Sequence, residues 1–237
     1  MIKKSISEKI TEFYENYYQT DLSEWRNISA QAKAKNIINI SNRYPHETIL
    51  EIGAGEGAVL FQLSKHKFGT SYTALEISSK AVNDITKKNI PGLMECKVFD
   101  GSSVPYENKQ FDLVILSHVI EHLEFPRQLI YEAGRVGSYV FIEVPLEDTI
   151  NLGKNVKNSI GHINFYSKET FKYLIESCHM QILDQRISNL PRESFIYRKG
   201  KRGNISYFIK ELALKVLPNL ATRIWTYHCY LVCRSCS

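Results

Sequence analysis

The sequence predicts an α/β fold built on a doubly wound, mostly parallel sheet. Three observations support this prediction: short apolar segments alternate with amphipathic segments from residue 48 onward, three glycines follow the first apolar segment, and 43% of the 237 residues are hydrophobic. Apolar strands that are buried on both faces and separated by helices are typical of parallel sheets. No apolar run approaches the roughly 20 residues of a membrane-spanning helix.

The apolar segments predict five strands in the first part of the chain. They are Thr48–Ile52, Ser71–Glu76, Cys96–Phe99, Phe111–Leu116 and Tyr139–Val144. Three segments with helical spacing lie between them: Ala58–Lys67, Ser79–Asn89 and Pro126–Gly134. Before the first strand, residues 5–43 have a helical pattern that includes Ala30–Ile40. This alternation is expected of a sheet covered by helices on both faces.

The last part of the chain departs from that alternation. Ser167 has the position of a helix N-cap, and Gln181–Ser188 and Thr226–Cys233 predict two further strands. No usual crossover helix separates these strands, so we expect an antiparallel pair at the sheet edge. The intervening insertion, Asn189–Trp225, contains a basic loop and one amphipathic helix whose polar face has mixed charge. We expect that helix to be a lid or to pack on the core.

Three glycines lie where the first strand meets the next helix, in Glu51-Ile52-Gly53-Ala54-Gly55-Glu56-Gly57. Glycine at such a turn lets backbone N–H groups approach a ligand that a Cβ atom would exclude. Ligands of open α/β sheets bind beyond the carboxyl ends of the strands. Glu76 ends the second strand, where its carboxylate can accept hydrogen bonds from ribose hydroxyls. The sequence therefore predicts a site for a ligand that contains a nucleoside.

Two classes of nucleoside ligand fit this pattern. The segment from Gly53 to Ala58 satisfies the G-x-G-x-x-A pattern of dinucleotide sites, so a nicotinamide-dependent oxidoreductase is one alternative. However, Glu51 and Glu56 would crowd a pyrophosphate with negative charge, whereas they suit a ligand with an ammonium and a sulfonium group. Asp100, after the third strand, can accept a hydrogen bond from an adenine amino group. These carboxylates favour a cationic nucleoside.

Five segments between about Thr48 and Tyr173 resemble, in order, the class I S-adenosylmethionine-dependent methyltransferases that act on small molecules. They are Leu50–Gly57, Leu75–Ser78, Phe99–Gly101, Phe111–Val114 with Ser117–Leu123, and Gly161–Ser167. The resemblance implies a seven-stranded Rossmann-like sheet with an antiparallel last strand. It also implies a single domain, divided into an N-terminal helical cap (1–47), a cofactor-binding core (48–188), a substrate-side insertion (189–225) and the last strand (226–237).

The resemblance also implies that S-adenosyl-L-methionine is the cofactor and S-adenosyl-L-homocysteine its product. The methionine part would contact Glu51, Gly53, Ala54, Gly55 and Gly57; the ribose Glu76 and Ile77; the adenine Asp100 and Gly101; and the methyl-transfer site Ser117 and His118. No N/D-P-P-Y/F motif follows Ser117. In this family that motif marks methylation of amino nitrogens in bases and glutamines, so we expect methylation at oxygen.

His118, Glu121 and His122 have the i, i+3, i+4 spacing that places side chains on one face of a helical turn. A histidine can take the proton of an alcohol as it attacks the methyl group, so His118 and His122 are the candidate catalytic residues. Alternatively, these residues and His162 hold a divalent metal, as in some small-RNA 2′-hydroxyl and quinone methyltransferases. Those relatives carry Glu in place of His118, which favours the base. A third alternative is that His122 only orients the turn.

Residues outside the common core would contact the acceptor, namely Tyr18, Trp25, His162, Arg192 and Arg198. The basic residues near Arg198 suit an anionic acceptor, such as a phosphorylated metabolite or a nucleotide-linked sugar, although most charge runs are simply solvated.

Charge and targeting signals set the remaining expectations. The net charge of +5 is too small to indicate nucleic acid, so a nucleic-acid methyltransferase is the weaker alternative. No apolar segment of a signal peptide follows the charges of Met1–Lys9. We therefore expect a cytoplasmic monomer or homodimer that acts on a small molecule, without stable membrane insertion.

Overall fold

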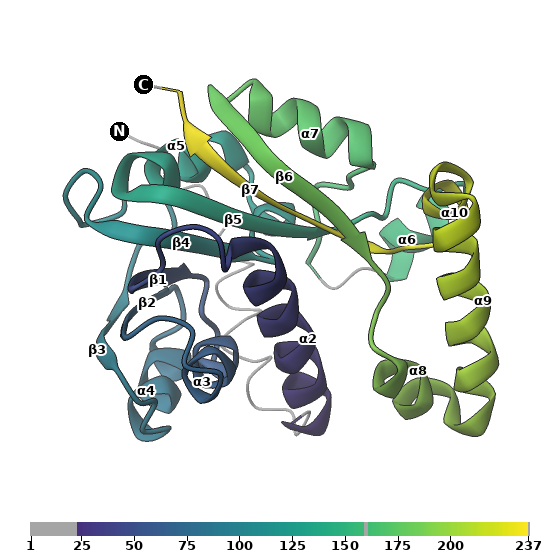
Figure 1. The fold of residues 1–237 in the computed structure, drawn as a ribbon, viewed down its shortest axis with the longest axis horizontal. Helices are drawn as coiled ribbons and strands as arrows, with labels where there is room; N and C mark the ends of the chain where they lie inside the picture. Colours follow the sequence, from purple (N-terminus) through teal and green to yellow (C-terminus); the bar gives the residue numbers. More distant parts are fainter. Residues whose placement is uncertain (1–22, 159–160, 237) are drawn as a thin grey trace.

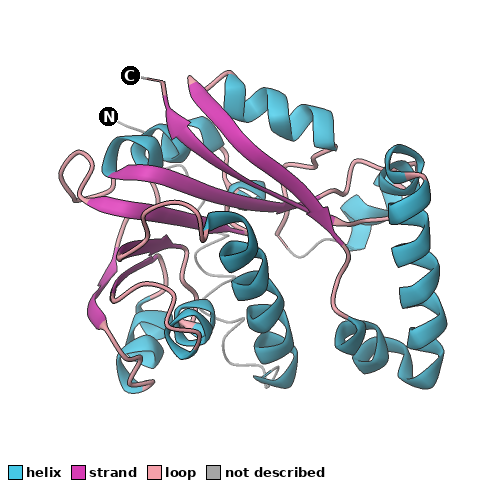
Figure 2. Ribbon diagram, viewed as in Figure 1, coloured by secondary structure: helices cyan, strands magenta, loops and turns pink. Residues whose placement is uncertain are grey.

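The computed structural model describes residues 23–158 and 161–236, and its centre is a seven-stranded sheet (Figures 1 and 2). The strands are β1 (Thr48–Ile52), β2 (Ser71–Glu76), β3 (Leu93–Val98), β4 (Phe111–Ser117), β5 (Gly137–Pro145), β6 (Met180–Ser188) and β7 (His228–Ser235). Their order is β3-β2-β1-β4-β5-β7-β6, and β7 is antiparallel to both of its neighbours. The mostly parallel sheet with an antiparallel last strand is confirmed.

Helices cover both faces of this sheet (Figure 2). They are α2 (Ser23–Ser41), α3 (Ala58–Lys65), α4 (Ser79–Lys87), α5 (Pro126–Val136), α6 (Leu152–Asn158), α7 (Lys168–Glu176), α8 (Arg192–Lys199), α9 (Gly203–Val216) and α10 (Pro218–Ile224). One hydrophobic core joins the sheet to α2, α3 and α4, and a second joins it to α5 and α7. None of the described helices is long and apolar enough to cross a bilayer.

Most predicted elements have the expected place, and the differences have physical causes. Strand β3 begins at Leu93 rather than Cys96, because its pairing with β2 starts at Leu93. The sequence missed this start because β3 is an edge strand, and its exposed side chains break the apolar pattern. The predicted N-cap is confirmed: the Ser167 hydroxyl accepts a hydrogen bond from the Thr170 N–H in a capping box. The antiparallel pair of late strands is also confirmed, with β6 at the sheet edge.

The insertion between β6 and β7 contains three helices, α8, α9 and α10, where the sequence predicted one. Its amphipathic helix was expected to be a lid or to pack on the core, and its apolar residues do not pack on the core. Large apolar side chains of α9, including Phe208 and Leu212, are more than half exposed. The helix instead turns Lys210 inward, where this side chain donates a hydrogen bond to the Thr226 carbonyl (2.7 Å).

The topology brings several chain segments to one edge of the sheet. The parallel strands β1, β2, β4 and β5 all end there, and β7 begins there because it runs in the opposite direction, with His228 paired to Pro145. The turns that follow the parallel strands and the first residue of β7 therefore surround a common space.

Candidate functional site

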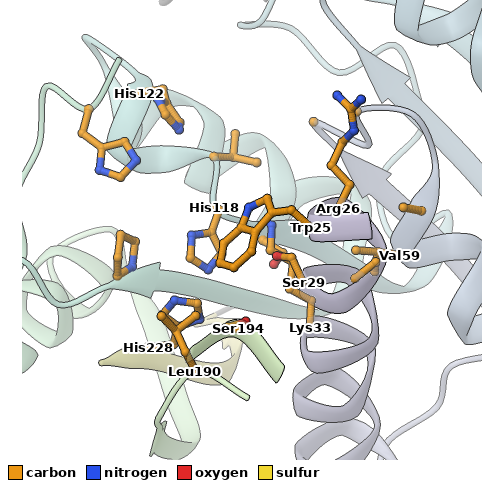
Figure 3. Close-up of a pocket in the computed structure, with 18 of the residues that line it drawn as sticks. Trp25, Arg26, Ser29, Lys33, Val59, His118, His122, Leu190, Ser194 and His228 are labelled. Atoms are coloured by element: carbon orange, nitrogen blue, oxygen red, sulfur yellow. The ribbon is translucent and has the colours of Figure 1, made fainter. Parts of the chain in front are cut away.

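A cavity of about 690 Å³ lies at this edge of the sheet. Its walls come from the glycine loop, the ends of β2, β4 and β5, the start of β7, and helices α2, α8 and α9. Figure 3 shows His118 and His228 close together in this pocket, with Trp25 and Lys33 projecting from α2. A cavity of this size is ample for a small-molecule ligand.

The glycine loop has the backbone that its sequence predicted. Gly53, Gly55 and Gly57 have φ values of 76°, 56° and 73°, in the left-handed region that side chains with a Cβ rarely adopt. At Gly53 an added Cβ would also lie 2.7 Å from a methyl group of Val119. The Gly55 N–H donates a hydrogen bond to Glu76 Oε2 (2.7 Å), so the loop and the end of β2 are joined at the cavity wall.

Two buried carboxylates face the cavity beside this loop. Glu51 is 3% exposed, and its Oε2 has no hydrogen-bond partner among the described residues. Burial, reinforced by the charge of Glu76 and opposed by Lys33, raises the pKa of Glu51 to about 8. A buried carboxyl with an unsatisfied oxygen is stabilised by a cationic ligand. The Glu51 site therefore suits a cationic group, and its predicted contact with the ammonium group of S-adenosylmethionine stays a prediction.

A second group of side chains gathers where β4, β5 and β7 meet. One ligand atom each of His118, Glu143 and His228 lies within 4.8 Å of the others, and Glu143 is fully buried. Glu143 accepts hydrogen bonds from the Ser117 hydroxyl (2.8 Å) and the Asn36 amide (2.7 Å), and its Oε1 lies 3.5 Å from His228 Nδ1.

These contacts determine the protonation states. Burial alone would raise the pKa of Glu143, but its interactions with His228 and His118, with the charge of Lys33, lower the pKa to about 2. Burial, together with the charges of Lys33 and His228, lowers the pKa of His118 well below its usual value. His118 is therefore neutral at pH 7, and its buried Nε2 has no hydrogen-bond partner among the described residues. It also has a positive φ of 59°, a strained backbone that is common at functional sites.

A third group lies beside it, after β4. Ligand atoms of Glu121, His122 and His162 lie within 4.8 Å of one another. Glu121 is fully buried, and neither of its oxygens has a well-formed hydrogen bond among the described residues, although Oε1 lies 3.2 Å from His118 Nδ1. His162 Nδ1 lies 2.6 Å from Glu147 Oε2, and this contact and the charge of Glu121 outweigh burial and raise the pKa of His162. Two imidazoles and a carboxylate suit a divalent transition metal, so the metal alternative remains open.

Basic side chains also line the cavity. Arg198 and Lys199 come from α8 and Lys210 from α9, whereas Lys33 comes from α2 and its charge reaches Glu51 and Glu143. Within residues 23–158 and 161–236 none of the four forms a close ion pair with a carboxylate. The Arg198 guanidinium lies 4.4 Å from the centre of the Trp25 ring. Burial, reinforced by the charges of Arg198 and Lys199, lowers the pKa of Lys210 to about 8. A buried lysine beside two other cations favours a bound anion.

The cavity brings together most of the residues that the sequence singled out. Those that line it are Trp25, Glu51, Gly53, Ala54, Gly55, Glu76, Ile77, Ser117, His118, His122, His162 and Arg198.

Five predicted site residues are not among the described residues that line the cavity. Gly57 packs toward Ile85 and Ile90, and Asp100 accepts hydrogen bonds from the Ser102 and Ser103 N–H groups beside Gly101. Arg192 donates a hydrogen bond to Asn204. Tyr18 lies outside the described residues. The roles assigned to these residues stay predictions.

The sequence did not single out Lys33, Glu143, Lys210 or His228 as site residues. The available signal was the antiparallel direction of the last strand, which places its first residues beside the carboxyl ends of the parallel strands. His228 could have been found in this way. Glu143, by contrast, lies within an apolar strand, and only the packed structure shows that it faces two imidazoles.

Comparison with known proteins supports the same family. Residues 50–139 match a family model described as a methyltransferase domain. No curated protein matches the chain.

Solved structures agree in fold. An S-adenosylmethionine-dependent methyltransferase from Aquifex aeolicus has a TM-score of 0.57 and 15% identity, with 91% of this chain and 95% of that chain covered. One from Archaeoglobus fulgidus has a TM-score of 0.57 and 16% identity, over 88% and 94%. The [4+2]-cyclase SpnF has a TM-score of 0.62 and 13% identity, over 86% and 80%. Because a cyclase shares the fold, the fold alone does not determine the reaction.

Proposed function

We propose that the chain, whose residues 50–139 match a methyltransferase domain, is a class I S-adenosylmethionine-dependent methyltransferase that transfers a methyl group to an oxygen atom of an anionic small molecule. One arrangement supports this proposal: a single cavity has buried carboxylates beside the glycine loop, a neutral histidine at the end of β4, and basic side chains from α8 and α9. The carboxylates suit a cationic nucleoside, the neutral histidine suits a hydroxyl group, and the basic side chains suit a phosphate or carboxylate.

The glycine loop and the two carboxylates beside it would hold the cofactor. S-adenosylmethionine, when bound, supplies an electrophilic methyl group on a sulfonium that is already a good leaving group. Glu51 would bind the ammonium group, and Glu76, held by the Gly55 N–H, would accept hydrogen bonds from the ribose hydroxyls. The chain then has mainly to align the acceptor and exclude water.

His118 would remove the acceptor's proton. In the tautomer with its hydrogen on Nδ1, which lies 3.2 Å from Glu121 Oε1, the unpartnered Nε2 has a lone pair that can accept a proton from a hydroxyl. The imidazolium formed would lie beside the carboxylates of Glu121 and Glu143, which stabilise positive charge there. The acid–base role assigned to His118 from the sequence is therefore the role that we propose.

The basic wall would select the acceptor. Arg198, Lys199 and Lys210 form no ion pair with a carboxylate within the described residues, so an anionic group of the acceptor would neutralise charges that otherwise repel one another. Trp25 and Phe195 line the same wall and offer aromatic surface for a ring of the acceptor. These features favour a phosphorylated or carboxylated metabolite over a neutral one.

Calorimetric titration of the protein with S-adenosylhomocysteine and with NAD tests the cofactor class. We expect S-adenosylhomocysteine to bind more tightly as the pH rises from about 6 to 8, by up to about tenfold per pH unit. The reason is that the Glu51 carboxyl, with a pKa of about 8, is protonated at pH 7 in the free protein and must ionise to pair with the ammonium group. Binding at pH 7 should therefore release close to one proton.

The matched variant is Glu51→Gln, which keeps the shape of the side chain but cannot ionise. It should bind S-adenosylhomocysteine more weakly, and its affinity should not increase as the pH rises from 6 to 8. An unchanged pH dependence in this variant would remove Glu51 from the cofactor site. Tight binding of NAD without binding of S-adenosylhomocysteine would contradict the proposed function as a whole.

A further inference from the structure

Helix α9 presents a continuous apolar stripe to solvent. Its members recur at i, i+3, i+4, i+7 and i+11, which places them on one side of the helix. They are Ile205, Phe208, Ile209, Leu212 and Val216, with exposed fractions of 65%, 58%, 53%, 63% and 62%. Leu217 and Leu220 extend the stripe into α10, with exposed fractions of 56% and 52%. We call these seven residues the outer stripe.

The orientation of α9 is fixed by contacts on its opposite side. Lys210 donates a hydrogen bond to the Thr226 carbonyl (2.7 Å), and the Tyr227 hydroxyl donates one to the Lys210 carbonyl (2.8 Å). The Lys210 ammonium also lies 4.6 Å from the centre of the Tyr227 ring. A surface helix of a globular protein normally turns its apolar side toward the core and its charged side toward water. Helix α9 instead turns Lys210 inward and its apolar stripe outward, so the outer stripe is available to a partner.

Helix α6 and the turn before it add to the same apolar surface. The Ile150 N–H donates a hydrogen bond to the Arg223 carbonyl (2.8 Å), which joins the turn before α6 to α10. Figure 1 shows α6 beside α10, at the upper end of α9. The side chains of Ile150, Leu152 and Val156 are 75%, 37% and 48% exposed. The apolar surface thus extends beyond one helix, and exposed patches of this kind mark interaction sites.

The charges along these segments are mostly basic. Residues 150–158 and 200–224 contain seven basic side chains and one acidic side chain, Glu211, while Asp148 and Glu169 lie beside Arg223 at the end of α10. Lys210 faces the cavity, which leaves six basic side chains at the apolar surface. They are Lys154, Lys157, Lys201, Arg202, Lys215 and Arg223, and all are exposed. An apolar stripe bordered by lysine and arginine is the pattern of helices that lie in the interface of an anionic bilayer.

We propose that the outer stripe, with α6 and its basic border, docks the protein on an anionic phospholipid surface. The apolar side chains would enter the boundary between headgroups and acyl chains, and the six cations would contact lipid phosphates. A second copy of the chain is the poorer occupant. A two-fold interface places the same patch on both subunits, so the basic borders would face each other.

Vesicle sedimentation tests this surface directly. We expect the full chain to bind phosphatidylcholine vesicles that contain phosphatidylglycerol, and to bind pure phosphatidylcholine vesicles at least about tenfold more weakly. The double variant Phe208→Ser with Leu212→Ser should lose binding to both. The triple variant Lys201→Glu, Arg202→Glu and Lys215→Glu should lose only the preference for phosphatidylglycerol.

The matched control is the double variant Met94→Ser with Tyr173→Ser, which removes side chains that are 73% and 70% exposed on β3 and α7, away from the stripe. It should bind vesicles like the unchanged protein, and melting temperatures check that every variant is folded. Absence of vesicle binding by the unchanged protein would overturn the proposal. An equal loss of vesicle binding in the control variant would also overturn it. A dimer in sedimentation equilibrium that the Phe208→Ser and Leu212→Ser variant abolishes would overturn it as well, because the stripe would then bind a second copy.

Discussion

His118→Ala is expected to lower the methylation rate by about 10²-fold or more, with little change in the affinity for S-adenosylhomocysteine. The imidazole is neutral at pH 7 because burial and neighbouring charges lower its pKa well below the usual value. A neutral imidazole can accept a proton, so the wild-type rate should stay level with falling pH to well below pH 6.5 before it declines. Initial rates measured across that pH range check the loss of activity and its pH dependence, and calorimetry checks the affinity for S-adenosylhomocysteine.

His179→Ala is the matched control. His179 has the same unusual backbone, with a φ of 55°, but it is exposed at the end of α7, so its loss should leave the rate unchanged. Chelation distinguishes the base from a metal. If EDTA abolished turnover, and Glu121→Gln and His162→Ala were as damaging as His118→Ala, a metal would replace the histidine base in this account.

Gly55→Val is expected to abolish detectable binding of S-adenosylhomocysteine while the protein still folds. Gly55 lines the cavity with a φ of 56°, a conformation that is a strained outlier for a β-branched residue. Relief of that strain would move the N–H that holds Glu76 Oε2, and the valine side chain would enter the space through which the backbone approaches the ligand. Calorimetry on protein of verified folding measures the loss.

Gly200→Val separates backbone strain from loss of the site. Gly200 has a φ of 59°, and an added Cβ there meets no atom within 4 Å. With ψ of −148°, Gly200 lies in a backbone region that is essentially restricted to glycine. This variant should lose stability, on the order of 1–3 kcal/mol, and retain full affinity for S-adenosylhomocysteine. If Gly55→Val bound the ligand as the unchanged protein does, the glycine loop would be a turn without a binding role.

The sequence predicted the sheet well because each parallel strand is a short apolar run with a distinct turn after it. Thr48–Ile52 and Ser71–Glu76 are confirmed residue for residue, since both strands are buried and end at polar turns. Edge strand β3 was harder, because residues such as Glu95 remain partly exposed and break the apolar pattern. The glycine loop could be predicted because its positive φ values favour glycine, so the backbone conformation is visible in the sequence itself.

The catalytic end of the cavity could be predicted only in part. His118 and its neighbours are close in sequence, and their spacing was enough to single them out. Glu143 and His228 reach His118 from two other strands, and their meeting depends on the order and register of β4, β5 and β7. Helix α9 shows a second limit. Its periodicity predicts an amphipathic helix correctly, but periodicity does not say which side faces the protein.

Transfer of an isotopically labelled methyl group tests the proposed reaction itself. The protein is incubated with methyl-labelled S-adenosylmethionine and fractionated anionic and neutral metabolites, and products are identified by mass spectrometry. We predict label on an oxygen of an anionic compound, with Lys210→Met raising the KM for that compound and leaving the affinity for S-adenosylhomocysteine unchanged, since Lys210 lies in the basic wall. Label on a neutral compound, or S-adenosylhomocysteine binding without any labelled product, would contradict the account.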